Sequence, residues 1–369
     1  MKIGFDAKRL YNNFTGLGNH SRTTLDILSE YYPDNRYILY TPSVKYNEIT
    51  SHYLEMENCD TIVPKGLFRG SLWRTFFVAQ DTKHDEIDLF HGLSNELPVG
   101  LKVPSVVTIH DVAFRGFREM YHWQDRKIYD IKWRYACNNA DRIIAISEYT
   151  KSDIVKYYNV DPDKIDVVYQ PVSQRYYEEV EKRREVLHIL VPYILYVGSI
   201  NSRKNLLGAI KAIQLLPSDL QLPLVVVGNG REYKNDVEAY ISSNGLQDMV
   251  LFQDHDVSDE ELQQLYLHAE LFVYPSFYEG FGLPVVEALL SHCPVVTSNV
   301  SSLPEAAGAM SLKANPEDIK DISANIERVL TDEDLRKKMK SAGYDYAMKT
   351  FNPEVSAKKL MEIYKRVKR

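Results

Sequence analysis

Short apolar runs rich in β-branched residues alternate with stretches whose apolar residues recur every three or four positions. In the first half the runs lie at 2–7, 36–41, 88–92, 105–111, 142–147 and 164–169, and in the second at 193–199, 223–229, 249–254, 270–276 and 293–298. Apolar runs joined by helical stretches predict buried strands of α/β parallel sheets. After about residue 315 only the helical period remains, so we expect the chain to end on helices.

A charged stretch at 176–192 interrupts this alternation, which restarts at Tyr193. The sequence therefore predicts two α/β domains, 1–178 and 179–352. The carboxyl ends of strands in open α/β sheets carry the binding loops. We expect the functional site in a cleft lined by such loops.

Composition narrows the class of protein. Hydrophobic residues make up 44% and charged residues 26% of the 369, which is typical of folded globular proteins. The 44 basic against 51 acidic residues give a net charge of −7, so we expect no nucleic-acid partner. Three cysteines without CxxC spacing favour a reducing cytoplasm. Neither a signal peptide nor a run of the roughly 20 apolar residues that span a membrane is expected.

The most informative segment is 274–298, where a strand leads into a glycine loop and a helix that Pro284 opens. Gly280 and Gly282 allow a ligand to approach the backbone, and a helix start favours an anion such as a diphosphate. Glu279 before the loop and Glu287, expected in the first helical turn, would then accept hydrogen bonds from sugar hydroxyls. The alternative is a helix cap with two solvated acids.

Three further segments carry candidate residues. Arg203 and Lys204 follow a strand and precede a helix, which suits a diphosphate, although a solvated basic pair is the alternative. Gly16 and Gly18 precede a helix expected near Asn19. The third glycine of a dinucleotide fingerprint is missing after them, which disfavours a nicotinamide cofactor.

Polar residues also end two strands of the first half. His110 and Asp111 end one, and a histidine at a strand terminus facing a cleft is a site candidate. Ser147 and Glu148 end another. They are either part of the site or a simple helix cap, and the sequence supports both interpretations equally.

The string E-G-F-G-L-P-x-x-E from Glu279 to Glu287 resembles the signature of the retaining, GT-B-fold glycosyltransferases of family four. The other strings follow in the family's order over essentially the whole chain, which looks similar to bacterial mannosyltransferases. The resemblance implies two Rossmann-like parallel-sheet domains that face a cleft. The N-terminal domain would bind the acceptor and the C-terminal domain the nucleotide-sugar donor. It also implies that an amphipathic helix at 353–369 returns to the N-terminal domain.

The resemblance also assigns roles. Arg203 and Lys204 would hold the pyrophosphate and stabilise the leaving diphosphate, and His110 would lie against the transferred sugar. Glu279 would hold sugar hydroxyls and Glu287 the ribose. The remaining donor contacts would be Gly16, Gly18, Ser199, Val257, Gly280, Phe281, Gly282 and Leu283.

The D-x-D string of Asp254 and Asp256 is a candidate for a divalent cation. The resemblance instead places the backbone of this segment against the nucleotide base. Because Arg203, Lys204 and a helix dipole already meet the diphosphate charge, we expect neither a metal nor another cofactor.

These expectations add up to a retaining enzyme that transfers a sugar, mannose from GDP-mannose being favoured, to a saccharide or lipid-linked acceptor of cell-surface polysaccharide synthesis. The alternatives are a UDP-hexose-dependent transferase, more distantly a nucleotide-sugar epimerase, and a catalytically silent nucleotide-binding subunit. The expected location is the cytoplasm or the inner face of its membrane. Trp73, Trp123 and Trp133 lie in segments that mix basic and aromatic residues. These segments are core helices or, alternatively, an acceptor groove or membrane-facing patch.

Overall fold

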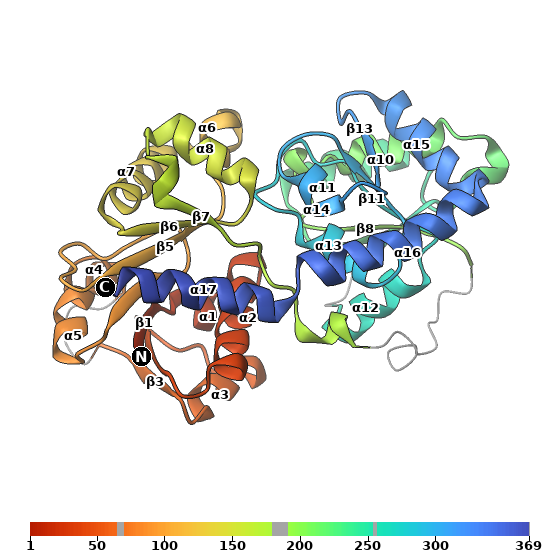
Figure 1. The fold of residues 1–369 in the computed structure, drawn as a ribbon. Helices are drawn as coiled ribbons and strands as arrows, with labels where there is room; N and C mark the ends of the chain where they lie inside the picture. Colours follow the sequence, from red (N-terminus) through yellow and green to blue (C-terminus); the bar gives the residue numbers. More distant parts are fainter. Residues whose placement is uncertain (65–69, 179–190, 254–256, 369) are drawn as a thin grey trace. The chain divides into compact units, whose positions relative to one another are not determined.

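The structure is a computed structural model that describes residues 1–64, 70–178, 191–253 and 257–368. The chain forms two compact units (Figure 1). The N-terminal unit comprises Met1–Pro171 and Pro353–Arg369, and the C-terminal unit comprises Val172–Asn352. The division at Pro171 falls slightly before position 178, where the charged stretch suggested a boundary.

The N-terminal unit contains a seven-stranded parallel sheet of order β3-β2-β1-β4-β5-β6-β7. Its strands are β1 (Lys2–Asp6), β2 (Arg36–Tyr40), β3 (Cys59–Ile62), β4 (Leu89–Gly92), β5 (Ser105–Ile109), β6 (Arg142–Ala145) and β7 (Ile165–Val167). The chain order reverses between β1 and β4. In open α/β sheets, ligands bind outside the carboxyl ends of the strands at such a switch point.

Helices cover this sheet. They are α1 (Lys8–Asn12), α2 (Gly16–Tyr31), α3 (Glu48–Glu55), α4 (Gly70–Leu72), the π-helix η1 (Trp73–Phe77), α5 (Val78–His84), α6 (Ala113–Gly116), η2 (Arg118–Met120), α7 (Trp123–Asn139), α8 (Glu148–Tyr158), η3 (Pro162–Lys164) and α17 (Pro353–Val367). Trp73 and Trp133 are buried in the core of this unit, whereas Trp123 is 59% exposed. The core interpretation therefore holds for the first two only.

The last helix, α17, belongs to the N-terminal unit (Figure 1). Leu360, Ile363 and Tyr364 pack into one core with residues of β1 and α2. The Tyr364 hydroxyl lies 2.7 Å from Nδ1 of the buried His91. Because the helix is amphipathic, folding it onto the sheet removes its apolar side from water.

The C-terminal unit contains a six-stranded parallel sheet of order β10-β9-β8-β11-β12-β13. Its strands are β8 (Ile194–Val197), β9 (Leu224–Val227), β10 (Val250–Phe252), β11 (Leu271–Tyr274), β12 (Val295–Ser298) and β13 (Leu312–Ala314). Here the order reverses between β8 and β11. Its helices are η4 (Gln174–Tyr177), η5 (Ser202–Lys204), α10 (Leu206–Gln214), η6 (Ser218–Leu220), α11 (Glu232–Ser243), α12 (Asp259–His268), α13 (Leu283–Leu290), α14 (Leu303–Ala307), α15 (Ile319–Thr331) and α16 (Glu333–Thr350).

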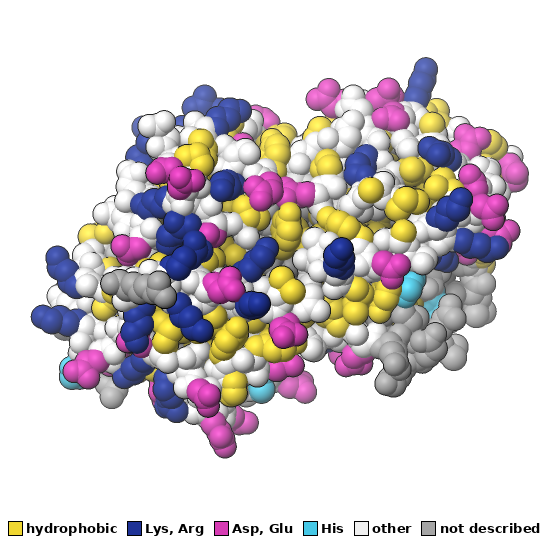
Figure 2. Space-filling view, viewed as in Figure 1, with side chains coloured by type: hydrophobic (Ala, Val, Ile, Leu, Met, Phe, Trp, Pro, Cys, Tyr) yellow, Lys and Arg dark blue, Asp and Glu magenta, His cyan; other side chains and the backbone are white. Residues whose placement is uncertain are grey.

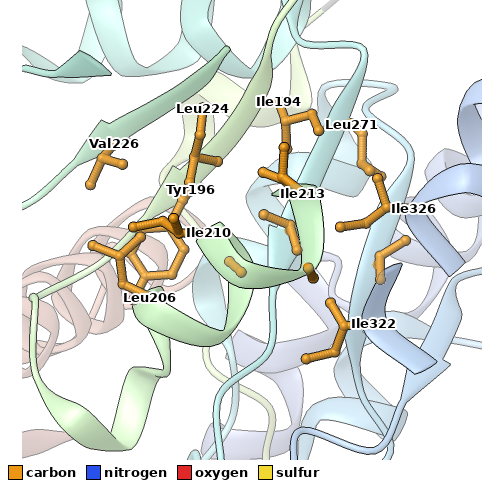
Figure 3. Close-up of a cluster of buried hydrophobic side chains, with 14 of the residues drawn as sticks. Ile194, Tyr196, Leu206, Ile210, Ile213, Leu224, Val226, Leu271, Ile322 and Ile326 are labelled. Atoms are coloured by element: carbon orange, nitrogen blue, oxygen red, sulfur yellow. The ribbon is translucent and has the colours of Figure 1, made fainter. Parts of the chain in front are cut away.

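The core of this unit explains the apolar runs in the sequence. Figure 3 shows Ile194 and Leu224 on neighbouring strands, with Ile210 of α10 and Ile326 of α15 packed against the sheet. These side chains are at most 3% exposed. Parallel strands that are covered on both faces are apolar throughout rather than alternating, as the runs at 193–199 and 223–229 are.

The surface is of mixed charge. On the face shown in Figure 2, basic and acidic side chains are interspersed. No helix within the described ranges is long and apolar enough to cross a membrane.

Candidate active site

The loop after β8 presents the two predicted cations. Asn201 caps the short helix η5, because its Oδ1 accepts a hydrogen bond from the Lys204 backbone N–H at 3.2 Å. Gly198 has φ +152°, and a Cβ there would lie 3.2 Å from Cδ of Lys204. A side chain at 198 would therefore strain the backbone and crowd the lysine.

Arg203 and Lys204 converge on one carboxylate, that of Glu279. The Arg203 Nη1 lies 3.0 Å from Glu279 Oε2, and the Lys204 Nζ lies 3.2 Å from Oε1. The hydroxyls of Tyr274 and Ser276 both donate to Oε1 at 2.9 Å. Of the four residues expected to act on the diphosphate or the transferred sugar, Arg203, Lys204 and Glu279 thus form one cluster at the carboxyl ends of β8 and β11, and His110 is the fourth.

The electrostatics of the cluster follow from its burial. Burial opposes ionisation of Glu279, which is 9% exposed, but Lys204 and Arg203 lower its pKa to about 2. Burial lowers the pKa of Lys204 from its usual value, against the attraction of Glu279. The carboxylate is therefore ionised at neutral pH. With both cations charged, the three groups carry one net positive charge, which favours a diphosphate ligand.

The glycine loop is held rigidly before α13. Gly282 caps the helix with φ +117°, and a Cβ there would lie 2.9 Å from Cδ2 of Leu303. The Ser302 hydroxyl lies 2.8 Å from the carbonyl oxygens of Glu279 and of Phe281. The Phe281 ring is buried, so only its backbone is available for the predicted donor contact. Gly280 and Leu283, the other predicted contacts in this loop, are half-buried.

Glu287 does not lie in the first turn of the helix, where the sequence predicted it. The helix begins at Leu283, so Glu287 lies past the first turn, which holds no acidic residue. It accepts a hydrogen bond from the Tyr266 hydroxyl at 3.1 Å, and it has no direct bond to Glu279. Burial raises the pKa of Glu287 to about 7, although the Tyr266 hydroxyl opposes this.

The other donor residues predicted in this unit are less constrained. Ser199 is exposed, and its hydroxyl oxygen accepts from the Asn201 amide at 3.1 Å. Val257 is half-buried ahead of α12. Asp254 and Asp256 of the D-x-D string lie outside the described residues. Among the residues that are described, no group of three or more His, Cys, Asp or Glu side chains is arranged to hold a metal ion.

In the N-terminal unit, α2 begins at Gly16 itself rather than near Asn19. Both predicted glycines therefore lie in the first turn. A Cβ on Gly18 would lie 1.7 Å from the Asn13 carbonyl oxygen, so only glycine fits there. A Cβ on Gly16 would have no atom within 4 Å, so the structure does not require glycine at this position.

His110 is buried at the end of β5 with both ring nitrogens occupied. Its Nε2 lies 2.8 Å from the Leu93 carbonyl oxygen, so this nitrogen donates. Its Nδ1 lies 2.8 Å from Nε2 of Gln170 and accepts from that amide. Burial lowers the pKa of His110, so the ring is neutral. The Asn95 side chain accepts from the His110 backbone N–H at 2.7 Å.

Sequence reasoning missed His20, whose ring meets His110 edge-on at a centroid distance of 4.5 Å. The Nδ1 of His20 is buried without a partner in the described part of the chain. The signal in the sequence that could have identified His20 was its position two residues after Gly18. Gln170, Tyr274 and Ser276 were also missed, because nothing local marks them as partners of distant site residues. Ser147 accepts from the Thr150 N–H at 3.0 Å and is a helix cap.

Two parallel-sheet Rossmann-like units with polar clusters at their strand ends are the features of the α/β GT-B fold. The family "Glycosyl transferases group 1" matches residues 180–346 and "Glycosyltransferase Family 4" matches 39–175. The O-antigen chain mannosyltransferase B of Escherichia coli is 35% identical over 287 residues, which cover 75% of this chain and 74% of that protein. The chain therefore belongs to the glycosyltransferase family that these two models describe, and it is similar to bacterial mannosyltransferases.

Two further comparisons show how much of the chain is similar in sequence and how much in fold. The serotype-specific mannosyltransferase WbdA of Escherichia coli is 31% identical over 211 residues, 55% of this chain but only 26% of WbdA. The crystal structure of Anabaena Alr3699/HepE in complex with UDP-glucose superposes with a TM-score of 0.77 at 18% identity, covering 99% of this chain and 100% of that one. At this identity the second likeness shows the fold.

Proposed function

We propose that this glycosyltransferase transfers mannose from GDP-mannose to a saccharide or lipid-linked saccharide, with retention of the anomeric configuration. The sugar is inferred from the similarity to O-antigen mannosyltransferases. The observation that carries the proposal is the cluster in which Glu279 holds Arg203 and Lys204 at the strand ends. By the same similarity the product belongs to cell-surface polysaccharide, made at the cytoplasmic face of the membrane.

The cations act on the leaving group. As the glycosidic bond breaks, negative charge grows on the diphosphate oxygen. Arg203 and Lys204, already fixed by Glu279, Tyr274 and Ser276, meet that charge without reorganising. The backbone N–H groups at the start of α13 add a second source of positive potential. This arrangement supports catalysis without a divalent cation.

Glu279 has one oxygen to offer the sugar. Among the described residues its Oε1 is used by Lys204, Tyr274 and Ser276, whereas its Oε2 contacts Arg203. A carboxylate oxygen can accept more than one hydrogen bond. We therefore assign Oε2 to the hydroxyls of the transferred mannose.

Retention follows from attack on the face that the diphosphate leaves. The acceptor oxygen forms its bond to the anomeric carbon, and a departing phosphate oxygen takes the acceptor proton. No side chain is assigned as a nucleophile. Neutral His110 lies against the sugar in this scheme, and Glu287 accepts from the ribose hydroxyls.

The test is to incubate the protein with GDP-mannose, UDP-glucose and other nucleotide sugars and to measure release of nucleoside diphosphate. We expect GDP-mannose to be consumed fastest, and an α-linked product in the proton NMR spectrum when an acceptor is present. Preferred release of UDP would favour the UDP-hexose alternative. No release from any donor, although nucleotides bind, would favour the catalytically silent subunit.

A further inference from the structure

A cavity of about 320 Å³ opens in the N-terminal unit at the switch point of its sheet. Its lining comes from four places: the end of β1, η1, the loop after β4, and α7. Asp6, Arg74, Glu96 and Lys132 supply its charged groups. The remaining lining residues are Thr75, Phe76, Leu97, Pro98, Val99, Ile128, Ile131 and Tyr135.

The charged groups form one connected network. The Arg74 Nε lies 2.7 Å from Asp6 Oδ2, and its Nη1 lies 3.0 Å from Glu96 Oε2. Lys132 Nζ lies 2.9 Å from the same Glu96 oxygen. The two carboxylates offset the charges of Arg74 and Lys132, and Lys8 also interacts electrostatically with Asp6 and Glu96.

Two polar atoms of this network remain available. The Arg74 Nη2 is buried without a hydrogen-bond partner among the described residues, and Arg74 is only 6% exposed. Both cations contact Oε2 of Glu96, and the second oxygen of this carboxylate, Oε1, is a further acceptor. A buried donor left unpaired costs about 1 to 3 kcal/mol, and a wholly apolar ligand would leave it unpaired. A hydroxyl group can accept from Nη2 and donate to Oε1.

The margin of the cavity is apolar and exposed. Phe76 is 52%, Ile128 is 49% and Ile131 is 69% exposed. Three large apolar side chains around a polar base suit a ligand that has hydroxyls at one end and an apolar group at the other.

We propose that this cavity binds the acceptor as a neutral sugar carrying an apolar aglycone. The sugar hydroxyls meet Arg74 and Glu96, and the aglycone lies on Phe76, Ile128 and Ile131. The cavity adjoins the predicted transfer site, because Glu96 follows Asn95, whose side chain holds the His110 backbone at 2.7 Å. This proposal rests on the proposed function, since an acceptor is the second substrate of that reaction.

The test measures binding of octyl and methyl α-mannosides, and of the matching α-glucosides, to the full chain by calorimetry without donor. Burying even part of an octyl chain at about 0.8 kcal/mol per methylene predicts at least tenfold tighter binding of the octyl compounds. Equal affinity of the octyl and methyl forms of both sugars would overturn the proposal.

Variants locate the binding. Ile131→Ser should weaken only the octyl glycosides, whereas Ile49→Ser, at an isoleucine of α3 that is 52% exposed, should change nothing. Val99→Trp fills the cavity without touching the ion pairs and should abolish binding of both forms, with the unfolding midpoint unchanged. Unaltered binding in the Val99→Trp variant would overturn the location.

The two proposals fail differently. If the octyl glycosides bind as expected but no donor is turned over, the acceptor cavity stands and the proposed transfer fails. If transfer occurs and Val99→Trp leaves the acceptor KM unchanged, the transfer stands and the cavity assignment fails.

Discussion

The two units present different chemistry near the carboxyl ends of their strands. At the switch point of the C-terminal unit, Glu279 is ionised between Arg203 and Lys204, and the cluster carries net positive charge. In the N-terminal unit, His110 after β5 and its neighbour His20 are buried and neutral. One architecture therefore supports a cluster of paired charges in one unit and a pair of uncharged histidines in the other.

The charge of each buried group depends on the groups that it contacts. Cations paired to a carboxylate keep their charge in a buried place, whereas a histidine that meets only amide and carbonyl groups loses it to desolvation. We infer that Arg203 and Lys204 keep their charge for the departing diphosphate. The predictions below would break or sharpen this contrast.

The largest effect is expected for Lys204→Ala. The variant removes a cation from an oxygen whose negative charge grows in the transition state, so kcat should fall by about 100-fold or more. Steady-state kinetics with a saturating donor measures it. Lys211→Ala is the matched control, because Lys211 lies on the adjacent helix α10 against the Tyr240 ring. A change in donor KM alone would contradict the assignment of Lys204 to the leaving group.

Glu287 should make donor binding sensitive to pH. Burial raises its pKa to about 7, and only its ionised form accepts fully from ribose hydroxyls. As pH falls through 7 the carboxylate takes up a proton, so donor KM should rise about tenfold between pH 8 and pH 6. Glu287→Gln should give a high donor KM that no longer varies over this range. If the variant kept the wild-type pH dependence, another group would be responsible for it.

The sequence predicted the fold well because buried parallel strands are apolar throughout. The fold class was right, and the runs at 193–199 and 270–276 correspond to β8 and β11. The charged residues were candidates because they follow strands directly. The roles given to them remain predictions that kinetics must test.

Other parts of the site could not be read from the sequence. Tyr266 bonds Glu287 across 21 positions and Gln170 bonds His110 across 60, and no local pattern signals such pairs. The start of α2 was misplaced because glycine usually precedes a helix rather than occupying its first turn. At Gly18 the close approach of Asn13 overrides that preference.

Gln170→Glu would break the contrast by adding charge to the N-terminal unit. A carboxylate beside Nδ1 of His110 should raise the pKa of that histidine and favour its cationic form. A cation near a sugar that gains positive charge in the transition state is unfavourable. We expect kcat to fall about tenfold at pH 6 and to recover as the pH rises. Gln170→Met, which removes the bond without adding charge, should show no such recovery, and a pH-independent loss in both variants would point to packing alone.

The smallest effect is expected for removal of divalent cations. If Arg203, Lys204 and the start of α13 meet the diphosphate charge, a metal would add little, and EDTA should change kcat by less than about twofold. Assays with and without EDTA, followed by added manganese, measure this. Asp254→Ala tests the D-x-D string directly and should match the wild type in both conditions. Activity that EDTA abolishes, that manganese restores, and that Asp254→Ala removes would mean that a metal ion and not the paired cations neutralises the leaving group. The contrast between the two units would then lose its electrostatic basis.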